Sequence, residues 1–103
     1  MAAITGTKVK VTQLASQYAI LIITAPIGSS SDTIDITPAA HGCKAIIGVL
    51  GAVITAGLDA AFSYLQVART DDDTLTVKSF EEDGTPATDF TGTTVEIALL
   101  VEL

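Results

Sequence analysis

The sequence predicts an all-β domain, a β-sandwich or jelly-roll-like fold of about seven strands, and three observations lead to this fold class. Isoleucine, valine and threonine, whose branched side chains suit pleated and half-buried surfaces, are abundant. Lysine, glutamate, arginine and glutamine, which would cover the outer faces of several helices, are scarce. Short apolar segments recur between turn signals along the 103 residues.

The N-terminal quarter of the chain contains two predicted strands. Residues 1–6 are weakly patterned and are expected to form a flexible arm, which leaves residues 7–103 as one domain. Residues 7–13 alternate between polar and apolar side chains and predict the first strand. Residues 17–25 are a β-branched run, which is typical of a strand buried on both faces, or buried on one face and covered by an interface on the other.

The middle of the chain contains a short alternating strand and a long apolar one. Residues 32–37 alternate, with the isoleucines expected to face inward, and a turn around His41 follows. Residues 43–56 favour one long, bent, central strand, in which Gly48 and Gly51 mark bulges or close approaches of another backbone. A helix over residues 45–56 is the competing interpretation.

The C-terminal half is expected to form a hairpin followed by a final strand. Residues 61–69 and 74–80 are joined by a compact polar connection and predict the hairpin. Turn-forming residues then extend over 81–92. Residues 93–103 show the clearest alternation in the chain, broken only by Leu100, and predict a structural strand at the C-terminus.

Two apolar stretches are long enough to suggest membrane or targeting segments. Residues 18–28 are interrupted by Pro26 and show no small-residue cleavage site, which disfavours a signal peptide. Residues 45–65 contain three glycines and Asp59 and lack flanking lysine or arginine, which disfavours a spanning helix. We expect a soluble chain, in the cytoplasm or another compartment, unless it is part of a larger particle.

Charge excludes one class of partner. The formal net charge is −7, and the five basic residues are scattered, so no patch can neutralise a row of phosphates. Nucleic acid is therefore disfavoured as a partner, and anionic membrane surfaces are disfavoured for the same reason.

The apolar content points to a protein partner. Apolar residues make up 49% of the chain, and the mean hydropathy is +0.54, whereas a domain of this size has a limited interior. Some apolar side chains must therefore lie on the surface, where they usually mark a protein interface, so we expect a homo-oligomer or a permanent partner. The candidate interface residues, taken from the most apolar segments, are Ile20, Ile22, Ile47, Val49 and Leu100.

No catalytic constellation is recognisable. The chain has one histidine, His41, and one cysteine, Cys43, and no Gly-x-Ser-x-Gly elbow surrounds any serine. His41 is expected to be an exposed turn residue, and Cys43 a small buried thiol rather than half of a zinc site. We therefore expect a non-enzymatic protein without a cofactor.

Consecutive acids give the only metal hypothesis. Asp71, Asp72 and Asp73 form an oxygen-rich cluster of the kind that calcium requires, but without the spacing of an EF-hand loop. A cation on these residues is an alternative to a simple solvated turn. It accompanies a second functional hypothesis, a β-sandwich module that binds carbohydrate or another small ligand.

The whole-chain pattern resembles a known class of proteins. A loose N-terminus, strands rich in Thr, Ala, Gly and Ile, Gly-Ser and Asp-Gly loops and a strand ending at the C-terminus are similar to small virion proteins of tailed bacteriophages, in particular the capsid decoration (cement) type. The resemblance implies a virion location and a homo-oligomer, often a trimer, that clamps neighbouring capsid subunits. It implies no role for an individual residue.

Overall fold

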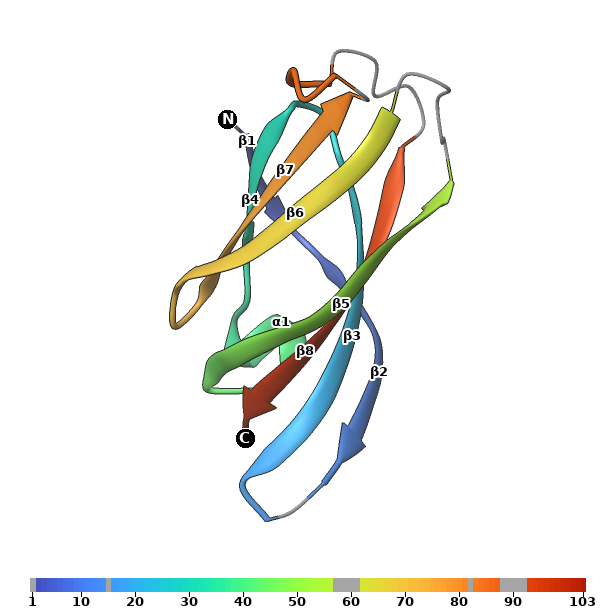
Figure 1. Ribbon diagram of the computed structural model, residues 1–103. Helices are drawn as coiled ribbons and strands as arrows, with labels where there is room; N and C mark the ends of the chain where they lie inside the picture. Colours follow the sequence, from blue (N-terminus) through green and yellow to red (C-terminus); the bar gives the residue numbers. More distant parts are fainter. Residues whose placement is uncertain (1, 15, 57–61, 82, 88–92) are drawn as a thin grey trace.

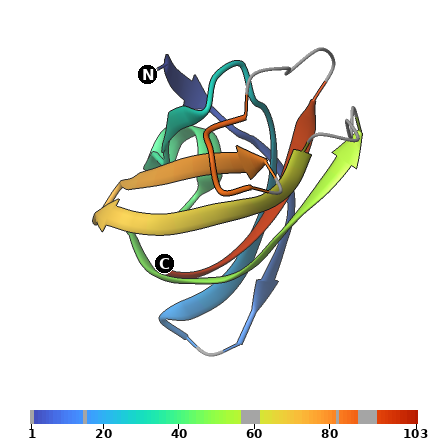
Figure 2. The ribbon, with the colours of Figure 1, turned by 45° about the horizontal axis from the view of Figure 1, so that its top comes forward.

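The computed structural model describes residues 2–14, 16–56, 62–81, 83–87 and 93–103. These residues form two packed four-stranded sheets, ordered β1-β4-β7-β6 and β2-β3-β8-β5, in an elongated molecule of 43 × 21 × 20 Å (Figure 1). Figure 2 shows the β6–β7 hairpin crossing in front of the second sheet. The fold is therefore the predicted all-β sandwich.

The described residues contain eight strands and a one-turn helix. In chain order they are β1 (Ala2–Thr5), β2 (Thr7–Gln13), β3 (Tyr18–Pro26), β4 (Ser31–Asp35), α1 (Pro38–His41), β5 (Ala45–Ala56), β6 (Phe62–Asp71), β7 (Thr74–Glu81) and β8 (Thr94–Glu102). The seven predicted strands correspond to β2 through β8, and β1 is additional. The turns predicted over 57–61 and 88–92 lie outside the described residues.

The core lies between the two sheets and follows the alternation of β3, β7 and β8. Every second residue of β8 is buried, from Val95 to Val101, and the same holds for β3 from Ala19 to Ala25. The opposite sheet contributes buried residues such as Leu75 of β7. Burial of each large aliphatic side chain stabilises the fold by roughly 1.5–3 kcal/mol, so this contact between the sheets dominates the stability.

Strand β8 lies in the interior of its sheet and pairs with a neighbouring strand on each side. Nine consecutive residue pairs join it to β3 without a register shift, from Tyr18 with Glu102 to Pro26 with Thr94. On its other side it pairs with β5. The C-terminal segment is therefore a strand, as its alternation predicts, and the structure places it in the interior of its sheet.

Strand β5 settles the main ambiguity of the sequence, because residues 45–56 are a strand and not a helix. Its pairing with β8 shifts register at Ile46/Gly48, Val49/Gly51 and Ile54/Ala56, and two of these irregularities include the predicted glycines. The prediction that this strand is central is wrong, because β5 is the edge of its sheet. A Cβ added at Gly48 or Gly51 would meet no atom within 4 Å in the described part of the chain, so these glycines mark irregularities of the strand and no close contact on the side where a side chain would project.

The N-terminal residues belong to the sandwich. Residues 2–5, expected as an arm, form β1, which pairs in parallel with β4, so they are a paired edge strand. Gly6 then carries the chain from one sheet to the other and is buried. A Cβ at this position would lie 3.1 Å from Ile23 Cδ1, so only glycine fits the crossing without displacing core atoms.

Helix α1 replaces the predicted turn. The Thr37 side chain accepts a hydrogen bond from the Ala40 N–H at its N-terminus, and Gly42 ends it with φ of 73°, in the left-handed region that favours glycine. Pro38 at the start of this helix has the fixed φ that suits a first turn. The helix brings His41 under the β1–β2 crossing.

Candidate functional site: the apolar surface around β5

The outer side of the β2-β3-β8-β5 sheet carries apolar side chains where a solvated sheet would carry polar ones. Ile20 lies opposite Leu100 and Ile22 opposite Ala98 in the β3–β8 ladder. Their positions alternate with the core positions of the same strands, and all four are partly exposed. This row of apolar side chains continues toward β5.

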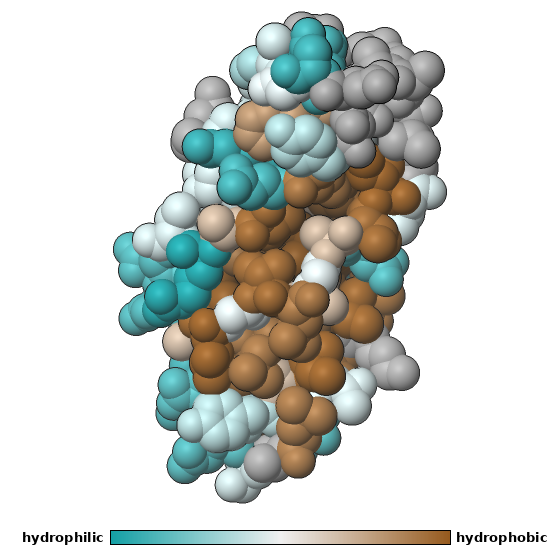
Figure 3. Space-filling view, in the orientation of Figure 1, coloured by the Kyte–Doolittle hydropathy of each residue, from teal (hydrophilic) through white to brown (hydrophobic). Residues whose placement is uncertain are grey.

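Strand β5 extends the apolar row to the edge of the sheet. Its twelve residues include no charged side chain, and Ile47, Leu50 and Val53 are 43%, 56% and 58% exposed. Figure 3 shows a broad hydrophobic area across the middle of the molecule, where β5 runs in Figure 1. We call the residues of this area and of the adjoining row the β5 surface: Ile20, Ile22, Ile47, Leu50, Val53, Ala98 and Leu100.

A small notch indents the β5 surface. It encloses about 220 Å³ and is lined by Ile22, Gly51, Ala52, Val53, Glu96 and Ala98. Gly51 and the two alanines leave the space that larger side chains would fill. The notch can accept one apolar side chain of another molecule.

Among the described residues, backbone and side-chain hydrogen bonds cover the free edge of β5 at its start. The Ile46 N–H donates to the Asp72 carbonyl at 2.7 Å, and Arg69 Nε donates to the Ile46 carbonyl at 2.7 Å. Arg69 is held there by an ion pair with Asp72. The β6–β7 turn thus hydrogen-bonds to the start of β5 at Ile46. The apolar residues of β5 from Ile47 onward lie beyond these hydrogen bonds.

The five predicted interface residues fall into three environments. Ile20, Ile22 and Leu100 lie on the outer face of the sheet, and Ile47 lies at a β5 irregularity, largely exposed. Val49 instead packs against the core, opposite the buried Leu99. The sequence prediction does not include Leu50, which falls at the register shift between Val49 and Gly51, or Val53, which follows the same alternation as Ile47.

His41 is not an exposed turn residue, which corrects the sequence prediction. It is 1% exposed, its Nδ1 accepts from the Thr37 N–H at 3.0 Å, and its Nε2 lies 2.6 Å from the Gly6 carbonyl oxygen. Since Nδ1 is the acceptor, Nε2 carries the proton that it donates to Gly6. Both ring nitrogens are used in fixing α1 to the β1–β2 crossing.

Cys43 is buried in the core, at 3% exposure, and burial raises the pKa of its thiol. A protonated, shielded thiol is a poor nucleophile and a poor metal ligand. The structure therefore gives Cys43 the packing role that the sequence suggests.

The candidate cation residues do not converge. The Asp71 carboxylate accepts from the Asp72 N–H at 2.7 Å, Asp72 is paired with Arg69, and Asp73 accepts from the Thr74 hydroxyl at 3.0 Å. Within the described part of the chain, no three His, Cys, Asp or Glu residues are grouped as metal ligands.

Glu81 and Asp83, two further acidic residues close together in the chain, belong to a hydrogen-bonded turn with Thr85. The Thr85 hydroxyl donates to Asp83 Oδ1 at 2.6 Å, and the Thr85 N–H donates to the same oxygen at 3.0 Å. These bonds stabilise the carboxylate and hold the pKa of Asp83 below its ordinary value. The Glu81 carboxylate also accepts from Thr85, at 3.3 Å, so these acids organise their own turn.

Comparison with known proteins gives no relative for this chain. Models of protein families, characterised proteins and solved structures include no significant match. No helix in the described residues is both long enough and apolar enough to cross a membrane.

Proposed function

We propose that this chain is a non-enzymatic structural protein of an assembly, which associates with copies of itself and with other subunits through the β5 surface. The observation that carries the proposal is the uncharged edge strand, with Leu50 and Val53 more than half exposed. Natural edge strands are usually shielded by charge, proline or short length, because an open edge pairs with other chains. This edge is long and carries none of those side chains.

Association offers β5 two kinds of contact at once. Backbone groups along a free strand edge can pair with a strand of another subunit, which gives affinity without a deep pocket. Apolar side chains covered at the same time contribute roughly 25 cal/mol for each Å² removed from water. The notch beside Gly51 offers a place for one partner side chain, which would fix the register of the contact.

The resemblance to decoration proteins supports a particular setting. In that class, small β domains, often trimers, clamp capsid subunits, and a virion location follows for this chain by analogy. The sandwich fold and the β5 surface are compatible with such a clamp. Co-migration with purified virions, and a gene beside a major capsid gene, are the expected observations.

Sedimentation equilibrium of two valine variants tests the proposal. The chain should sediment above its monomer mass of 10.6 kDa at micromolar concentration. Val53→Glu should shift the equilibrium toward the monomer, because a carboxylate buried in an apolar contact without a partner is costly. Val9→Glu is the matched control, since Val9 is 55% exposed against 58% for Val53 and lies on β2, the opposite edge of the same sheet.

Two results would contradict this assignment. A strictly monomeric wild-type chain that also fails to bind virions would remove the assembly function. Equal dissociation by Val9→Glu and Val53→Glu would mean that β5 is not the contact edge.

A further inference from the structure

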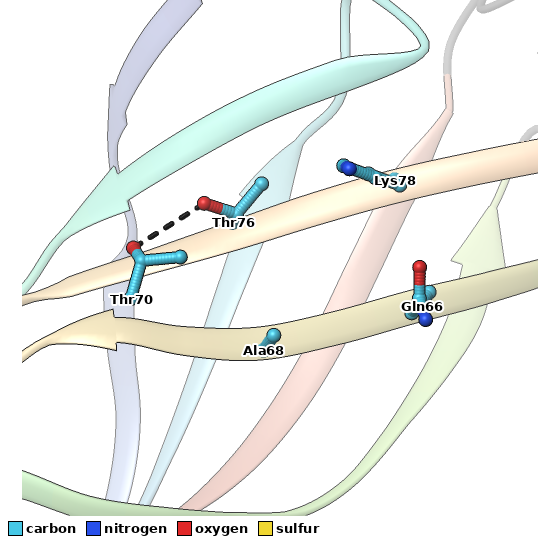
Figure 4. A pocket seen from close by; sticks show the side chains of 5 residues that line it. All are labelled: Gln66, Ala68, Thr70, Thr76 and Lys78. Carbon is cyan, nitrogen blue, oxygen red and sulfur yellow. Dashed lines mark hydrogen bonds between the residues drawn. The ribbon is translucent and has the colours of Figure 1, made fainter.

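A groove lined mainly by residues with polar groups lies on the sheet that does not carry the β5 surface. It encloses about 450 Å³ on the outer face of the β6–β7 hairpin and is lined by Gln66, Ala68, Thr70, Thr76 and Lys78 (Figure 4). Its volume is within the range of about 300–1,000 Å³ that is typical of ligand sites. Its lining is chemically unlike the apolar surface described above.

Residue size explains the hollow. Gln66 lies opposite Lys78, and Ala68 lies opposite Thr76 in the β6–β7 ladder, which has no register shift at these pairs. The short Ala68 therefore forms a floor between longer neighbours. Thr76 donates to the Thr70 hydroxyl at 3.3 Å (Figure 4). Thr70 in turn donates to the Thr74 carbonyl at 3.3 Å, so the hydroxyl groups at one end are held in place.

The opposite end of the groove supplies unused hydrogen-bonding groups. Gln66 and Lys78 are exposed, and neither side chain bonds to another residue in the part of the chain that the structure describes. An amide offers both donors and acceptors, an ammonium offers three donors, and the threonines offer hydroxyls. None of the described residues that line the groove carries a carboxylate, although the chain has a net charge of −7.

An aromatic pair continues the groove along the same two strands. Tyr64 lies opposite Phe80, one step along the face from Gln66 and Lys78, because side chains two residues apart share a side of the sheet. The two rings are stacked, with centroids 4.9 Å apart and planes at 19°. Tyr64 remains 47% exposed, so the pair presents a firm apolar platform beside the polar lining.

We propose that this groove binds a neutral oligosaccharide. A sugar ring combines an apolar C–H face, which packs on an aromatic ring, with hydroxyl groups that both donate and accept hydrogen bonds. Tyr64 matches the first requirement, and Gln66, Thr76 and Lys78 match the second. The site is open and lies on two paired strands, which suits one stretch of a longer chain rather than an enclosed small molecule.

An NMR titration with defined oligosaccharides tests the proposal. Cellohexaose, laminarihexaose, mannohexaose and maltohexaose are added separately to ¹⁵N-labelled full-length protein, up to about 10 mM, since exposed sites of this kind bind weakly. At least one probe should shift the backbone signals of β6 and β7 and the side-chain amide of Gln66. The signals of β2, β3 and β8 should not move.

Paired tyrosine variants identify the platform. Tyr64→Ala should weaken binding of the active probe by about tenfold or more. Tyr18→Ala should leave it unchanged, because Tyr18 is similarly exposed, at 43%, but belongs to the other sheet. Gln66→Ala, which removes an exposed side chain without disturbing the ring stack, should also weaken binding and serves as a second test if Tyr64→Ala unfolds.

Three outcomes would overturn the proposal: no shift with any probe, shifts confined to residues outside β6 and β7, or equal losses with Tyr18→Ala and Tyr64→Ala. The groove is independent of the proposed assembly function. Val53→Glu should therefore bind the active probe as the wild type does, whatever its oligomeric state.

Discussion

At the scale of single residues, three buried polar side chains differ in whether their polar atoms have hydrogen-bond partners. His41 uses both ring nitrogens, and Asp32, with no exposed surface, accepts from the N–H groups of Gly28 and Ser29 and from the Ser29 hydroxyl. Ser79 is buried with a hydroxyl that has no partner in the described residues. A buried polar group destabilises the fold unless it is hydrogen-bonded. Substitutions of the bonded residues should therefore lower the free energy of unfolding, whereas substitution of Ser79 should not.

His41→Ala should lower the free energy of unfolding by about 2–4 kcal/mol, because the Gly6 carbonyl and the Thr37 N–H would both lose their partner inside the protein. Lys44→Ala, an exposed neighbour, should change it by less than about 0.5 kcal/mol. Urea titrations followed by circular dichroism measure both. Equal stabilities for the two variants would show that the hydrogen bonds of His41 do not stabilise the β1–β2 crossing at Gly6.

Two serine-to-alanine substitutions should act in opposite directions. Ser79→Ala should leave the free energy of unfolding unchanged or raise it by about 1 kcal/mol, because it removes an unpartnered buried hydroxyl. Ser29→Ala should lower it by about 1–3 kcal/mol, because the Ser29 hydroxyl lies 2.5 Å from Asp32 Oδ1. The same urea titrations decide between them, and a loss of stability in Ser79→Ala would indicate a partner for its hydroxyl.

At the scale of elements, alternation in the sequence was sufficient for strands with one buried face. The bounds of β2 are those predicted, and the alternation of residues 93–103 describes the burial of β8 correctly. Alternation does not predict where a strand lies within its sheet. Nothing within residues 2–5 indicates their parallel pairing with β4, and the apolar β5 is as compatible with a central strand as with an edge.

The register of β8 can be tested with adjacent residues on opposite faces. Ile97, with no exposed surface, lies between the sheets, and Glu96 lies on the outer side. Ile97→Asp should lower the free energy of unfolding by about 4 kcal/mol or more, because it places an unpaired charge in the core. Glu96→Lys should change it by about 0.5 kcal/mol or less. Thermal unfolding of both variants measures the difference, and the reverse ranking would mean that the strand is shifted by one residue.

At the scale of the whole molecule, composition predicted that an apolar surface exists but not its full extent. The excess of apolar residues over core capacity is a property of the chain, whereas the location of the surface depends on which strand is the edge. Ile20, Ile22 and Leu100 can be predicted because each interrupts a polar face, whereas Leu50 cannot, because it falls at the register shift between Val49 and Gly51. Val53 follows the same alternation as Ile47, so the sequence pattern was sufficient to include it. The groove on β6 and β7 depends on pairing across a hairpin, so no local motif could reveal it.

The contrast between an uncharged contact surface and a net charge of −7 predicts how association depends on salt. Copies of the chain repel one another at long range. The residues of the β5 surface carry no charge, and Glu96, which lines its notch, adds to this repulsion instead of offsetting it. Raising the ionic strength from about 0.01 M to about 1 M shortens the screening length from about 30 Å to about 3 Å, so the association constant should increase. Sedimentation equilibrium across this series measures it. A decrease with salt would mean that charge pairs hold the oligomer together, and the contact would then lie outside the β5 surface.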